Sequence, residues 1–595
     1  MALHPFFTSF HMSCFIERVS FNLNPSYVPR TIKIIGAARM CDQTIIRRTG
    51  NYQPPIWKHE FIQSLRSKFT EETYVGWFKL KGEVKVIMDK VIGDSLKQLE
   101  LIDILQRLGI SYHFENEIKD VLKTIYEKSY ENDDWKNNNL YATSLEFRLL
   151  RQHGFNLSQD VFNNFFTDEM KSFNPHLYDD LSGMLGLYEA SFLCIEGENI
   201  LEKAKHFTIK HLEKYMRSCK DENEAAIIRH ALELPLHWRM PRLETRWFID
   251  IYEKKVDMNP MLLEFAKLDF NRVQSIHQRD LKYASSWWRS TGLGEKLSFA
   301  RDRLTENFFW TVGVGFEPEL SYFRRMTTKV NALITTIDDV YDVYGTLDEL
   351  QLFTDAVERW DVAAVDQLPD YMKICFLALH NSVNEMGFDV LRDKGINVIQ
   401  YLKKAWIDLC KTYMLEAKWY HTGYKPTLEE YLDNGWISIS GPVILVHAYV
   451  FVTSPTIKDM ESFKQYIDVI RWSSTILRLA DDLGTSSDEL KRGDVPKSIQ
   501  CYMNDTGASE NKAREHIKHL IVEAWKKLNK VEVENSIFPQ VFIERAKNLA
   551  RMAQCMYQYG DGHGIGHQET KVRVMSLLIQ PFYIRSYSEK LPNFI

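Results

Sequence analysis

Two short acidic stretches hold the side chains of this 595-residue chain that are best suited to chemistry. The first is DDVYD at residues 338–342, and the second is LADDLGTSSDE at residues 479–489. Around both stretches, apolar residues recur every three or four positions without strict alternation, which predicts helices. The spacing of the carboxylates within each stretch therefore indicates which way they point.

The first stretch places two carboxylates on one side of its predicted helix. At about 100° per residue, Asp342 lies roughly 40° from Asp338, and Asn331 and Thr335 fall on the same face. We expect apolar side chains to fill the opposite side: Val330, Leu333, Ile334, Ile337, Val340 and Tyr344. Small polar residues beside the carboxylates favour a lined cavity over an open, solvated surface.

The second stretch repeats this arrangement. Arg478, Asp481, Thr485 and Glu489 fit within an arc of roughly 80° at the same helical pitch. The other side of this helix carries Ile476, Leu479 and Leu483. Two oxygen-rich faces can thus confront each other across one cavity.

Oxygen ligands at this density favour a hard divalent cation. Mg²⁺ keeps several waters and binds through carboxylates shared with phosphate oxygens, so a diphosphate is the expected third component and Mn²⁺ an alternative metal. A single acidic helix face is usually only solvated, and one D-D-x-x-D pattern alone would be weak support. The second set, spaced as metal ligands, is what favours a metal site.

The overall composition limits the classes of function. Net charge is −6 and Lys and Arg form no basic stripe, so nucleic acid is not an expected partner. A chain of this length with 45% hydrophobic residues predicts a large core and two or three domains. No uninterrupted apolar run reaches about 18 residues, so we expect no membrane partner, and the longest run, Gly441–Val452, suits a buried helix. The eight cysteines form no C-x-x-C pair and are expected to be reduced.

The first 46 residues differ in composition from the rest. They carry seven Ser or Thr and four Arg or Lys, but only Glu17 and Asp42 as acids. This is typical of an organelle transit peptide, although a plain N-terminal arm has a similar composition. The pair Arg47-Arg48 follows, and then, after eight residues that include Pro54-Pro55, Trp57.

The remaining chain divides into two helical halves. From about residue 61 to residue 270 amphipathic helical patterns follow one another without alternating strand runs or hairpin signals, which predicts an all-α domain. A second helical half begins near Asn271 and contains both acidic stretches. We therefore predict an all-α fold with a leader at 1–46, an N-terminal domain at 47–270 and a catalytic, metal-binding domain at 271–595.

Basic and aromatic residues accompany the acidic stretches. Arg301 and Arg303 offer two planar forks of donors, which suit a diphosphate, although surface ion pairs with Asp302 and Glu306 would look the same. Lys497 follows the second stretch closely. The run YQYGDGHGIGHQE at 557–569 is rich in glycine, which fits a mobile lid, although a plain exposed loop would also look like this.

Three motifs follow one another along the chain: Arg301-Asp302-Arg303, Asp338-Asp339-x-x-Asp342 and Asp481-Asp482-x-x-Thr485-x-x-x-Glu489. This set, in this order, resembles the plant terpene synthases of the metal-ionisation class. The resemblance runs from about Arg47 to the C-terminus and includes the phrases TSLEFRLLRQHGF, FARDRLTENFFW, YLDNGWISISGP and LKRGDVPKSIQ. It implies an N-terminal α-barrel domain packed against a C-terminal α-bundle of the class I terpenoid synthase type. The Arg47-Arg48 to Trp57 element behind a leader resembles the monoterpene synthase branch, whose paired arginines cap the closed site and assist cyclisation. That branch implies a plastid location.

The resemblance also implies roles for individual residues. Asp338 and Asp342 would hold two Mg²⁺ ions, and Asp481, Thr485 and Glu489 a third. The diphosphate of geranyl diphosphate would be held by the metals and by basic residues: Arg301, Arg303, Arg478 and Lys497. The cation formed by ionisation would pass through linalyl diphosphate to a terpinyl cation, with Trp310 and Tyr557 shielding it by their aromatic faces.

A few positions leave choices open. The second stretch opens with Asp481 where many family members carry Asn, and both residues supply an oxygen ligand. The run at 557–569 leaves open whether Tyr557 or Tyr559 faces the cavity. Asn331 could orient a water and favour an alcohol or ether product.

Other functions remain as alternatives. A sesquiterpene synthase would accept farnesyl diphosphate, and an acyclic monoterpene synthase would use the same substrate without closing a ring. A chain-elongating prenyltransferase would carry two D-D-x-x-D elements, and a helical scaffold protein would need no chemistry. The sequence does not specify the product, and it gives no reason to expect more than a monomer.

Overall fold

The computed structural model describes residues 47–584 except for short gaps. The gaps are 68, 70, 130–135, 137, 168–172, 464–466, 535–537 and 565–567, and the side chains of 71, 72, 175, 176 and 492 are also left out. The predicted leader at 1–46 lies outside the described residues. Within these ranges every regular element is a helix, apart from one antiparallel bridge between Phe166 and Phe173. The prediction of an all-α fold is confirmed.

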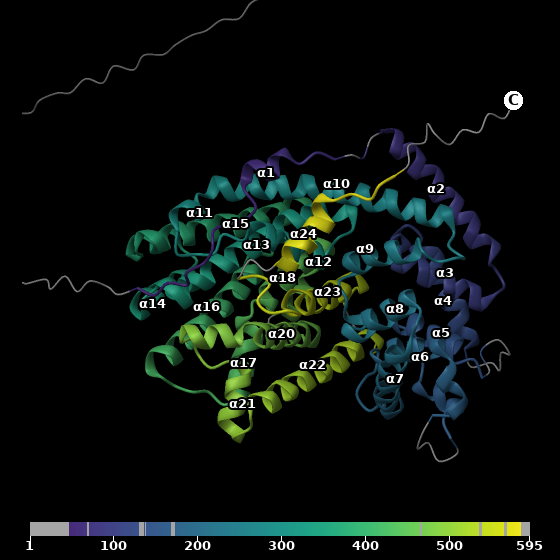
Figure 1. Ribbon diagram of the computed structural model, residues 1–595. Helices are drawn as coiled ribbons and strands as arrows, with labels where there is room; N and C mark the ends of the chain where they lie inside the picture. Colours follow the sequence, from purple (N-terminus) through teal and green to yellow (C-terminus); the bar gives the residue numbers. More distant parts are fainter. Residues whose placement is uncertain are drawn as a thin grey trace, which may run out of the picture. The chain divides into compact units, whose positions relative to one another are not determined.

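The first group of helices covers the N-terminal part of the described chain (Figure 1). From α3 to α8 its members pack on their neighbours in the chain or on the next helix but one, and α9 packs back on α3. The helices are α1 (His59–Ser64), α2 (Glu71–Lys90), α3 (Ser95–Arg107), α4 (Glu115–Lys128), α5 (Leu140–Gln152), α6 (Leu181–Ser191), α7 (Asn199–Ser218), α8 (Glu222–Glu233) and α9 (Pro241–Tyr252).

The second group contains both acidic stretches, on α13 and α20. It consists of α10 (Pro260–Thr291), α11 (Leu293–Lys296), α12 (Leu304–Val314), α13 (Ser321–Asp339), α14 (Leu347–Arg359), α15 (Asp370–Lys394), α16 (Ile399–Thr422), α17 (Leu428–Ser438), α18 (Gly441–Val452), α19 (Ile457–Ser462), α20 (Asp468–Arg492), α21 (Ser498–Thr506), α22 (Glu510–Val533), α23 (Gln540–Tyr557) and α24 (Gln568–Val574). Helix α13 packs on α12 and α18, and α20 packs on α18, α22 and α23.

Helix α10 links the two groups. Its N-cap is Asn259, whose side chain accepts hydrogen bonds from the N–H groups of Met261 and Leu262, and its C-cap is Gly292 in the left-handed conformation (φ 67°). Its 32 residues pack on α2 and α9 as well as on α12 and α13. The boundary predicted at 270/271 falls inside this continuous helix, so the division into domains there stays a prediction.

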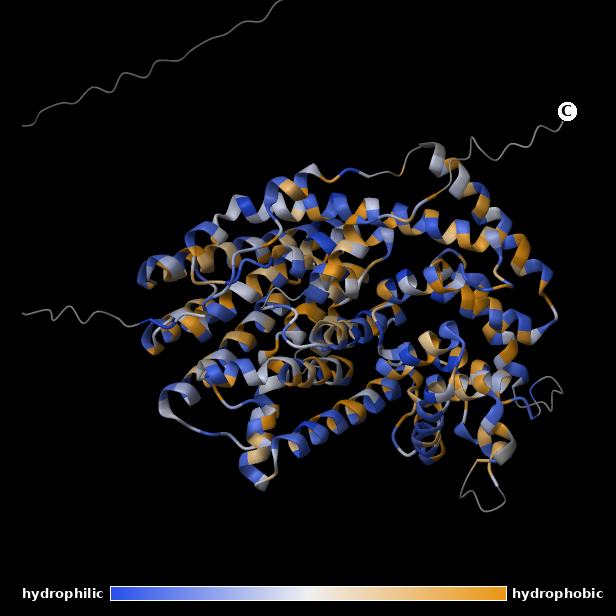
Figure 2. Ribbon diagram, in the orientation of Figure 1, coloured by the Kyte–Doolittle hydropathy of each residue, from blue (hydrophilic) through white to orange (hydrophobic). Residues whose placement is uncertain are grey.

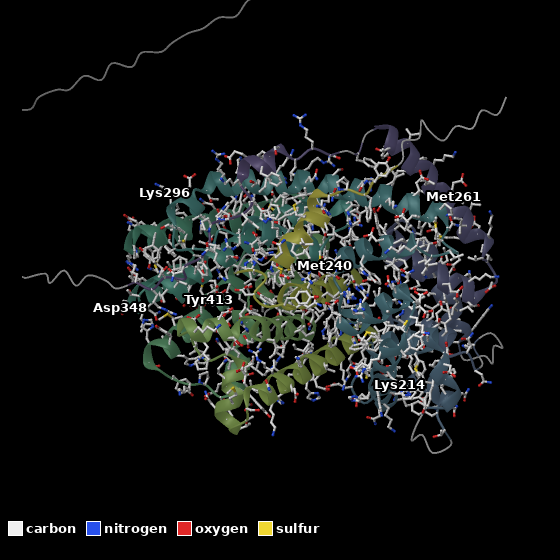
Figure 3. All side chains as sticks on the ribbon, in the orientation of Figure 1. Lys214, Met240, Met261, Lys296, Asp348 and Tyr413 are labelled. Carbon is white, nitrogen blue, oxygen red and sulfur yellow. The ribbon has the colours of Figure 1, made fainter. Side chains whose placement is uncertain are left out.

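The core of the second group contains the most apolar part of the chain. Leu428–Val452 is long and apolar enough to cross a membrane, but 72% of its most apolar window is buried inside the molecule. It forms two helices, α17 and α18, separated at Ser440, which has a φ of 68°. Most helices carry both hydrophobic and hydrophilic residues (Figure 2), and side chains fill the spaces between them (Figure 3). Gly441–Val452 is thus a buried helix, as expected.

We expect one buried histidine of α18 to make the fold acid-sensitive. His447 is fully buried, its Nδ1 lies 2.8 Å from the carbonyl oxygen of Val443, and burial lowers its pKa to about 4. An unfolded histidine titrates near pH 6.5, so this group destabilises the native state as the pH falls from about 6.5 to about 4, by up to about 3 kcal/mol. His447→Phe should lose less stability over that range.

The measurement is urea unfolding of wild type and variant at pH 7 and pH 5. His519→Phe, which changes an exposed histidine on α22, serves as the control and should follow the wild type. An identical loss of stability in His447→Phe and wild type between the two pH values would contradict the assignment.

Candidate active site

The first acidic stretch lies where α13 changes its helical geometry. The helix ends at Asp339 and continues as a π-helical turn, η6 (Val340–Tyr344), closed by a 2.8 Å hydrogen bond from the N–H of Gly345 to the carbonyl oxygen of Val340. A π turn bonds residue i to residue i+5, so the roughly 40° offset expected for an α-helix does not apply between Asp338 and Asp342. Both side chains nevertheless line the same cavity.

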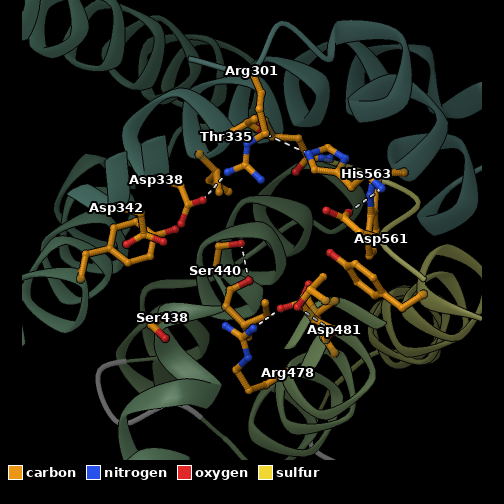
Figure 4. Close-up of a pocket in the computed structure, with 18 of the residues that line it drawn as sticks. Arg301, Thr335, Asp338, Asp342, Ser438, Ser440, Arg478, Asp481, Asp561 and His563 are labelled. Carbon is orange, nitrogen blue, oxygen red and sulfur yellow. Dashed lines mark hydrogen bonds and ion pairs between the residues drawn. The ribbon is translucent and has the colours of Figure 1, made fainter. Parts of the chain in front are cut away.

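This cavity has an empty volume of about 940 Å³, including its open mouth. Figure 4 shows Asp338 and Asp342 on one side, Arg478 and Asp481 below them, and His563 on the side opposite Asp338. Most of the residues predicted for the site line it: Arg301, Trp310, Asp338, Asp342, Arg478, Asp481, Thr485, Glu489, Lys497 and Tyr557. The structure thus brings together residues that lie far apart in the sequence.

Three predicted site residues are not part of this lining, and all are arginines. Arg47 donates to the carbonyl oxygen of Tyr344 at 2.8 Å and forms a two-pronged ion pair with Glu349 at 2.9 Å. Arg48 pairs with Asp494, just beyond the end of α20. The paired arginines therefore contact the chain directly after each acidic stretch. Arg303 donates to the carbonyl oxygen of Gly564 at 3.1 Å.

The structure corrects one detail of the expected helix faces. Ile334 lines the cavity, whereas we expected it on the side opposite the carboxylates. It precedes Asp338 by four residues, so at about 100° per residue it belongs within roughly 40° of Asp338. The expectation for Ile334 was therefore wrong: we assigned it to the face opposite the carboxylates, although its spacing places it beside Asp338. Its apolar side chain on α13 forms part of the cavity lining.

Other lining residues were not assigned to the site from the sequence. Glu416 and Tyr413 come from α16, and Asp561 and His563 from the segment after α23. The glycine-rich run at 557–569 was a usable signal for the last two. No signal pointed to Glu416, because the sequence does not tell which helix packs beside the acidic stretches.

Guanidinium groups neutralise part of each acidic face. The Arg301 side chain forms an ion pair with Asp338 and a second one, at 3.0 Å, with Asp339. The Arg478 side chain likewise pairs with Asp481 and, at 2.8 Å, with Asp482. In each stretch an Asp that lines the cavity is followed by an Asp that is fully buried, and both of these carboxylates pair with the same arginine.

The buried second aspartates also fix their own positions. Asp339 accepts a 2.7 Å hydrogen bond from the backbone N–H of Arg301. Asp482 accepts bonds from the hydroxyl of Tyr431 at 2.9 Å and from the N–H of Ser498 at 3.1 Å. These bonds hold each arginine at the edge of the cavity.

The carboxylates that line the cavity also repel one another. Burial and the neighbouring Asp338 raise the pKa of Asp342 well above its usual range. Burial, opposed by Arg478 and reinforced by Glu489, raises the pKa of Asp481 to about 7. A cation placed between such groups would relieve this repulsion.

The donor set fits Mg²⁺ bound together with a phosphate group. Among the described residues, no three His, Cys, Asp or Glu side chains lie close enough to hold a metal by themselves. Each acidic face instead offers a pair of carboxylates, and Thr485 adds a hydroxyl beside Asp481 and Glu489. Mg²⁺ commonly takes few protein carboxylates and completes its shell with water and substrate phosphate oxygens. Lys497, 3.8 Å from Glu489, adds positive charge beside them.

An aromatic wall, formed by Trp310, Tyr557 and His563, lines the same cavity beside the charged residues. The rings of Trp310 and Tyr557 lie 6.0 Å apart, and the ring of His563 lies 6.5 Å from that of Trp310. Burial, with a further contribution from Arg301 and Arg303, lowers the pKa of His563 to about 3, so its imidazole is neutral. Tyr557 lines the cavity, whereas Tyr559 is 50% exposed and hydrogen bonds Glu233.

Comparison with family models identifies both parts of the chain. The terpene synthase N-terminal domain matches residues 56–232, and the metal binding domain of the terpene synthase family matches residues 289–527. Myrcene synthase, chloroplastic, of Quercus ilex is 61% identical over 93% of this chain and 93% of that protein. The (-)-alpha-terpineol synthase of Vitis vinifera is also 61% identical, over 93% of this chain and 94% of that protein.

Solved structures share the same fold. A limonene synthase crystallised with 2-fluorolinalyl diphosphate is 49% identical, with a TM-score of 0.88, over 90% of this chain and 100% of that chain. Isoprene synthase from grey poplar, in complex with three Mg²⁺ ions and dimethylallyl-S-thiolodiphosphate, is 46% identical, with a TM-score of 0.82, over 89% of this chain and 99% of that chain. The resemblance noted in the sequence is confirmed: this chain belongs to the plant terpene synthase family.

Proposed function

We propose that this terpene synthase is a monoterpene synthase that ionises geranyl diphosphate with Mg²⁺ and closes the cation to cyclic products. The observation that supports this most directly is the composition of one cavity, which is lined by two acidic helical faces, basic side chains and an aromatic wall. The charged end suits a diphosphate, and the apolar end suits a hydrocarbon chain. Diphosphate is the other product.

The charged end would hold the leaving group. Bound Mg²⁺ ions stabilise the charge that develops on the diphosphate oxygens during ionisation. We assign two ions to Asp338 and Asp342, and a third to Asp481, Thr485 and Glu489, in keeping with the three Mg²⁺ ions in the isoprene synthase complex. Basic residues would hold the same diphosphate: Arg301, Arg478 and Lys497.

Two of these basic residues must change partners for this role. The guanidinium groups of Arg301 and Arg478 pair with Asp338 and Asp481, which are two of the proposed metal ligands. When a diphosphate enters, it offers each arginine a new anionic partner and frees the carboxylate for the metal. Diphosphate and metal should therefore bind cooperatively.

The apolar end would shape the cation. Trp310 and Tyr557 present aromatic faces whose attraction for a cation is worth up to about 2 kcal/mol or more when desolvated. The apolar side chains of Ile334, Ile444 and Leu477 restrict water beside them. The carbocation would then recombine as linalyl diphosphate, ionise again and close to a terpinyl cation. Asn331 lines the same cavity and could orient a water toward an alcohol product.

The ten-carbon substrate and the ring closure are proposed on further observations. Arg47 and Arg48 contact the chain directly after each acidic stretch, where they could cap the closed cavity.

Chloroplastic relatives and the composition of residues 1–46 support a plastid location. An acyclic product from the same substrate is the second candidate, since the myrcene synthase of Quercus ilex is as similar as the terpineol synthase. We further propose that residues 47–270 support a catalytic domain at 271–595.

Incubation with prenyl diphosphates tests the proposed function. With Mg²⁺ the protein lacking residues 1–46 should convert geranyl diphosphate to ten-carbon products, and Asp338→Ala should lower kcat by on the order of 10²-fold, because part of the leaving-group stabilisation is lost. Asp348→Ala, at an exposed position on α14, is the matched control. Chelation by EDTA should stop turnover.

Gas chromatography of the products separates the alternatives. Fifteen-carbon products from farnesyl diphosphate, with little turnover of geranyl diphosphate, would identify a sesquiterpene synthase. Normal turnover by Asp338→Ala would show that the metal site is wrongly assigned.

The change of partners by the arginines predicts coupled binding. Mn²⁺ titrated by electron paramagnetic resonance should bind weakly alone and about 5- to 150-fold more tightly with inorganic pyrophosphate, the usual range of coupling between two sites. Arg301→Gln and Arg478→Gln should lose most of this gain. Arg471→Gln, on the same helix as Arg478 but paired with Asp433, is the control. An unchanged gain in both site variants would refute the change of partners.

The N-terminal arginines yield a separate prediction. Arg47→Gln and Arg48→Gln remove the contacts with Glu349 and Asp494 and should shift products toward acyclic compounds or slow turnover of geranyl diphosphate. Linalyl diphosphate, which needs no isomerisation, should remain a usable substrate. Lys58→Gln, at an exposed position nearby, is the control. If rate and product profile match those of the wild type, these arginines do not assist cyclisation.

A further inference from the structure

The segment after α23 is built into the cavity wall. Residues 557–564 carry Asp561 and His563, which both line the cavity. The Asp561 carboxylate folds this segment back on itself by accepting hydrogen bonds from the N–H groups of His563 at 3.1 Å and Gly564 at 2.6 Å. We refer to residues 557–564 as the wall loop.

Side chains from other elements hold the wall loop from outside. Arg303, just before α12, donates to the carbonyl oxygen of Gly564 at 3.1 Å, and Thr570 on α24 donates to that of Gly562 at 3.0 Å. Both residues are buried, with exposures of 4% and 6%. Loss of a buried hydrogen bond leaves its partner unsatisfied, so these bonds strongly favour one loop position.

The packing around the loop leaves little room for another position. A Cβ on Gly562 would lie 2.2 Å from the carbonyl oxygen of Met556 and 2.9 Å from the Thr570 hydroxyl. On α20, a Cβ on Gly484 would lie 3.0 Å from the Cβ of Tyr557 and 3.2 Å from the carbonyl oxygen of Gly560. The loop thus sits against the helix that carries Asp481, with glycines where the backbones approach.

Arg303 differs from Arg301 although the two lie two residues apart. The Arg301 side chain lines the cavity, whereas Arg303 is not among the lining residues. Its two terminal nitrogens are engaged by main-chain oxygens, one by Asp302 at 3.0 Å and the other by Gly564. The second of these contacts joins the Arg303 side chain to the main chain of the wall loop.

We propose that Arg303 and Thr570 are positioning residues that hold the wall loop closed, so that Asp561 and His563 complete the cavity. Arg303 acts through the carbonyl of Gly564 and does not contact the diphosphate. This inference rests on the proposed function, because it assigns the closed loop to exclusion of water from a reacting cation. An open loop would admit water to the wall formed by Trp310 and His563 and raise the share of alcohol among the products.

Hydrogen exchange tests the loop without turnover. In Thr570→Val, a change that keeps the shape of the side chain, and in Arg303→Gln, the amides of residues 558–564 should exchange about fivefold faster, as expected for one lost hydrogen bond. Affinity for inorganic pyrophosphate with Mg²⁺ should stay within about twofold of the wild type. The control is Thr208→Val, which removes a buried hydroxyl bonded to Ala204 in the first helical group.

Each outcome decides the assignment. Faster exchange in both variants with retained pyrophosphate affinity supports it, and a larger alcohol share from geranyl diphosphate adds the functional consequence. Unchanged exchange in both variants overturns it, and a change in only one removes the other residue from the role. A tenfold loss of pyrophosphate affinity in Arg303→Gln with unchanged exchange would make Arg303 a diphosphate ligand instead. Failure of the wild type to release diphosphate from geranyl diphosphate would refute the proposed function and leave the exchange result standing.

Discussion

The constraint on which the site depends is the repulsion between carboxylates gathered around one cavity. The cavity is lined by Asp338 on α13, by Asp342 on the π turn that continues it, and by Asp481 and Glu489 on α20, together with Glu416 on α16. At the low effective dielectric of a protein interior, such groups cannot all remain charged without nearby cations. The helical frame must therefore hold these carboxylates apart and supply positive charge at fixed points.

The chain supplies that charge in the same way on both sides. In each acidic stretch a second aspartate, Asp339 or Asp482, is fully buried and anchors an arginine at the cavity edge. Each of these buried carboxylates also accepts a hydrogen bond from a backbone N–H group. Each arginine can then exchange a carboxylate for another anion without leaving its anchor. This gives a physical reason for two adjacent aspartates in each stretch.

Sequence periodicity was sufficient for the fold class and for most of the charged site. The spacing of four residues led us to expect Asp338 and Asp342 on one face, and both line the cavity although the π turn after Asp339 changes the angle between them. The same rule of about 100° per residue places Ile334 beside Asp338, but we assigned it to the opposite face, and that assignment was wrong. The π turn after Asp339 could not be foreseen from helical periodicity, and the Arg47 side chain that donates to the carbonyl oxygen of its last residue, Tyr344, is 297 residues away in the sequence.

Contacts between distant segments account for what the sequence could not tell. Arg303 and Gly564 are 261 residues apart, and Arg47 and Glu349 are 302 residues apart. In isolation Arg303 looked like a diphosphate ligand or a surface charge, and Arg47 like part of a cap. Only the fold shows that Arg303 contacts Gly564 and that Arg47 contacts Tyr344 and Glu349. Likewise, nothing in the sequence indicated that α16, which carries Glu416, would lie beside the acidic stretches.

The identity of the product depends on a still smaller set of contacts. A synthase named for myrcene, an acyclic hydrocarbon, and one named for terpineol, a cyclic alcohol, are both 61% identical to this chain. Overall identity therefore cannot separate the two outcomes. Competing fates of one cation need differ by only about 1.4 kcal/mol to give a tenfold preference, which is the size of a single hydrogen bond in the wall. In the proposed function the acidic faces would define the reaction class, whereas cavity-lining residues such as Trp310, Asn331 and His563 would select among its products.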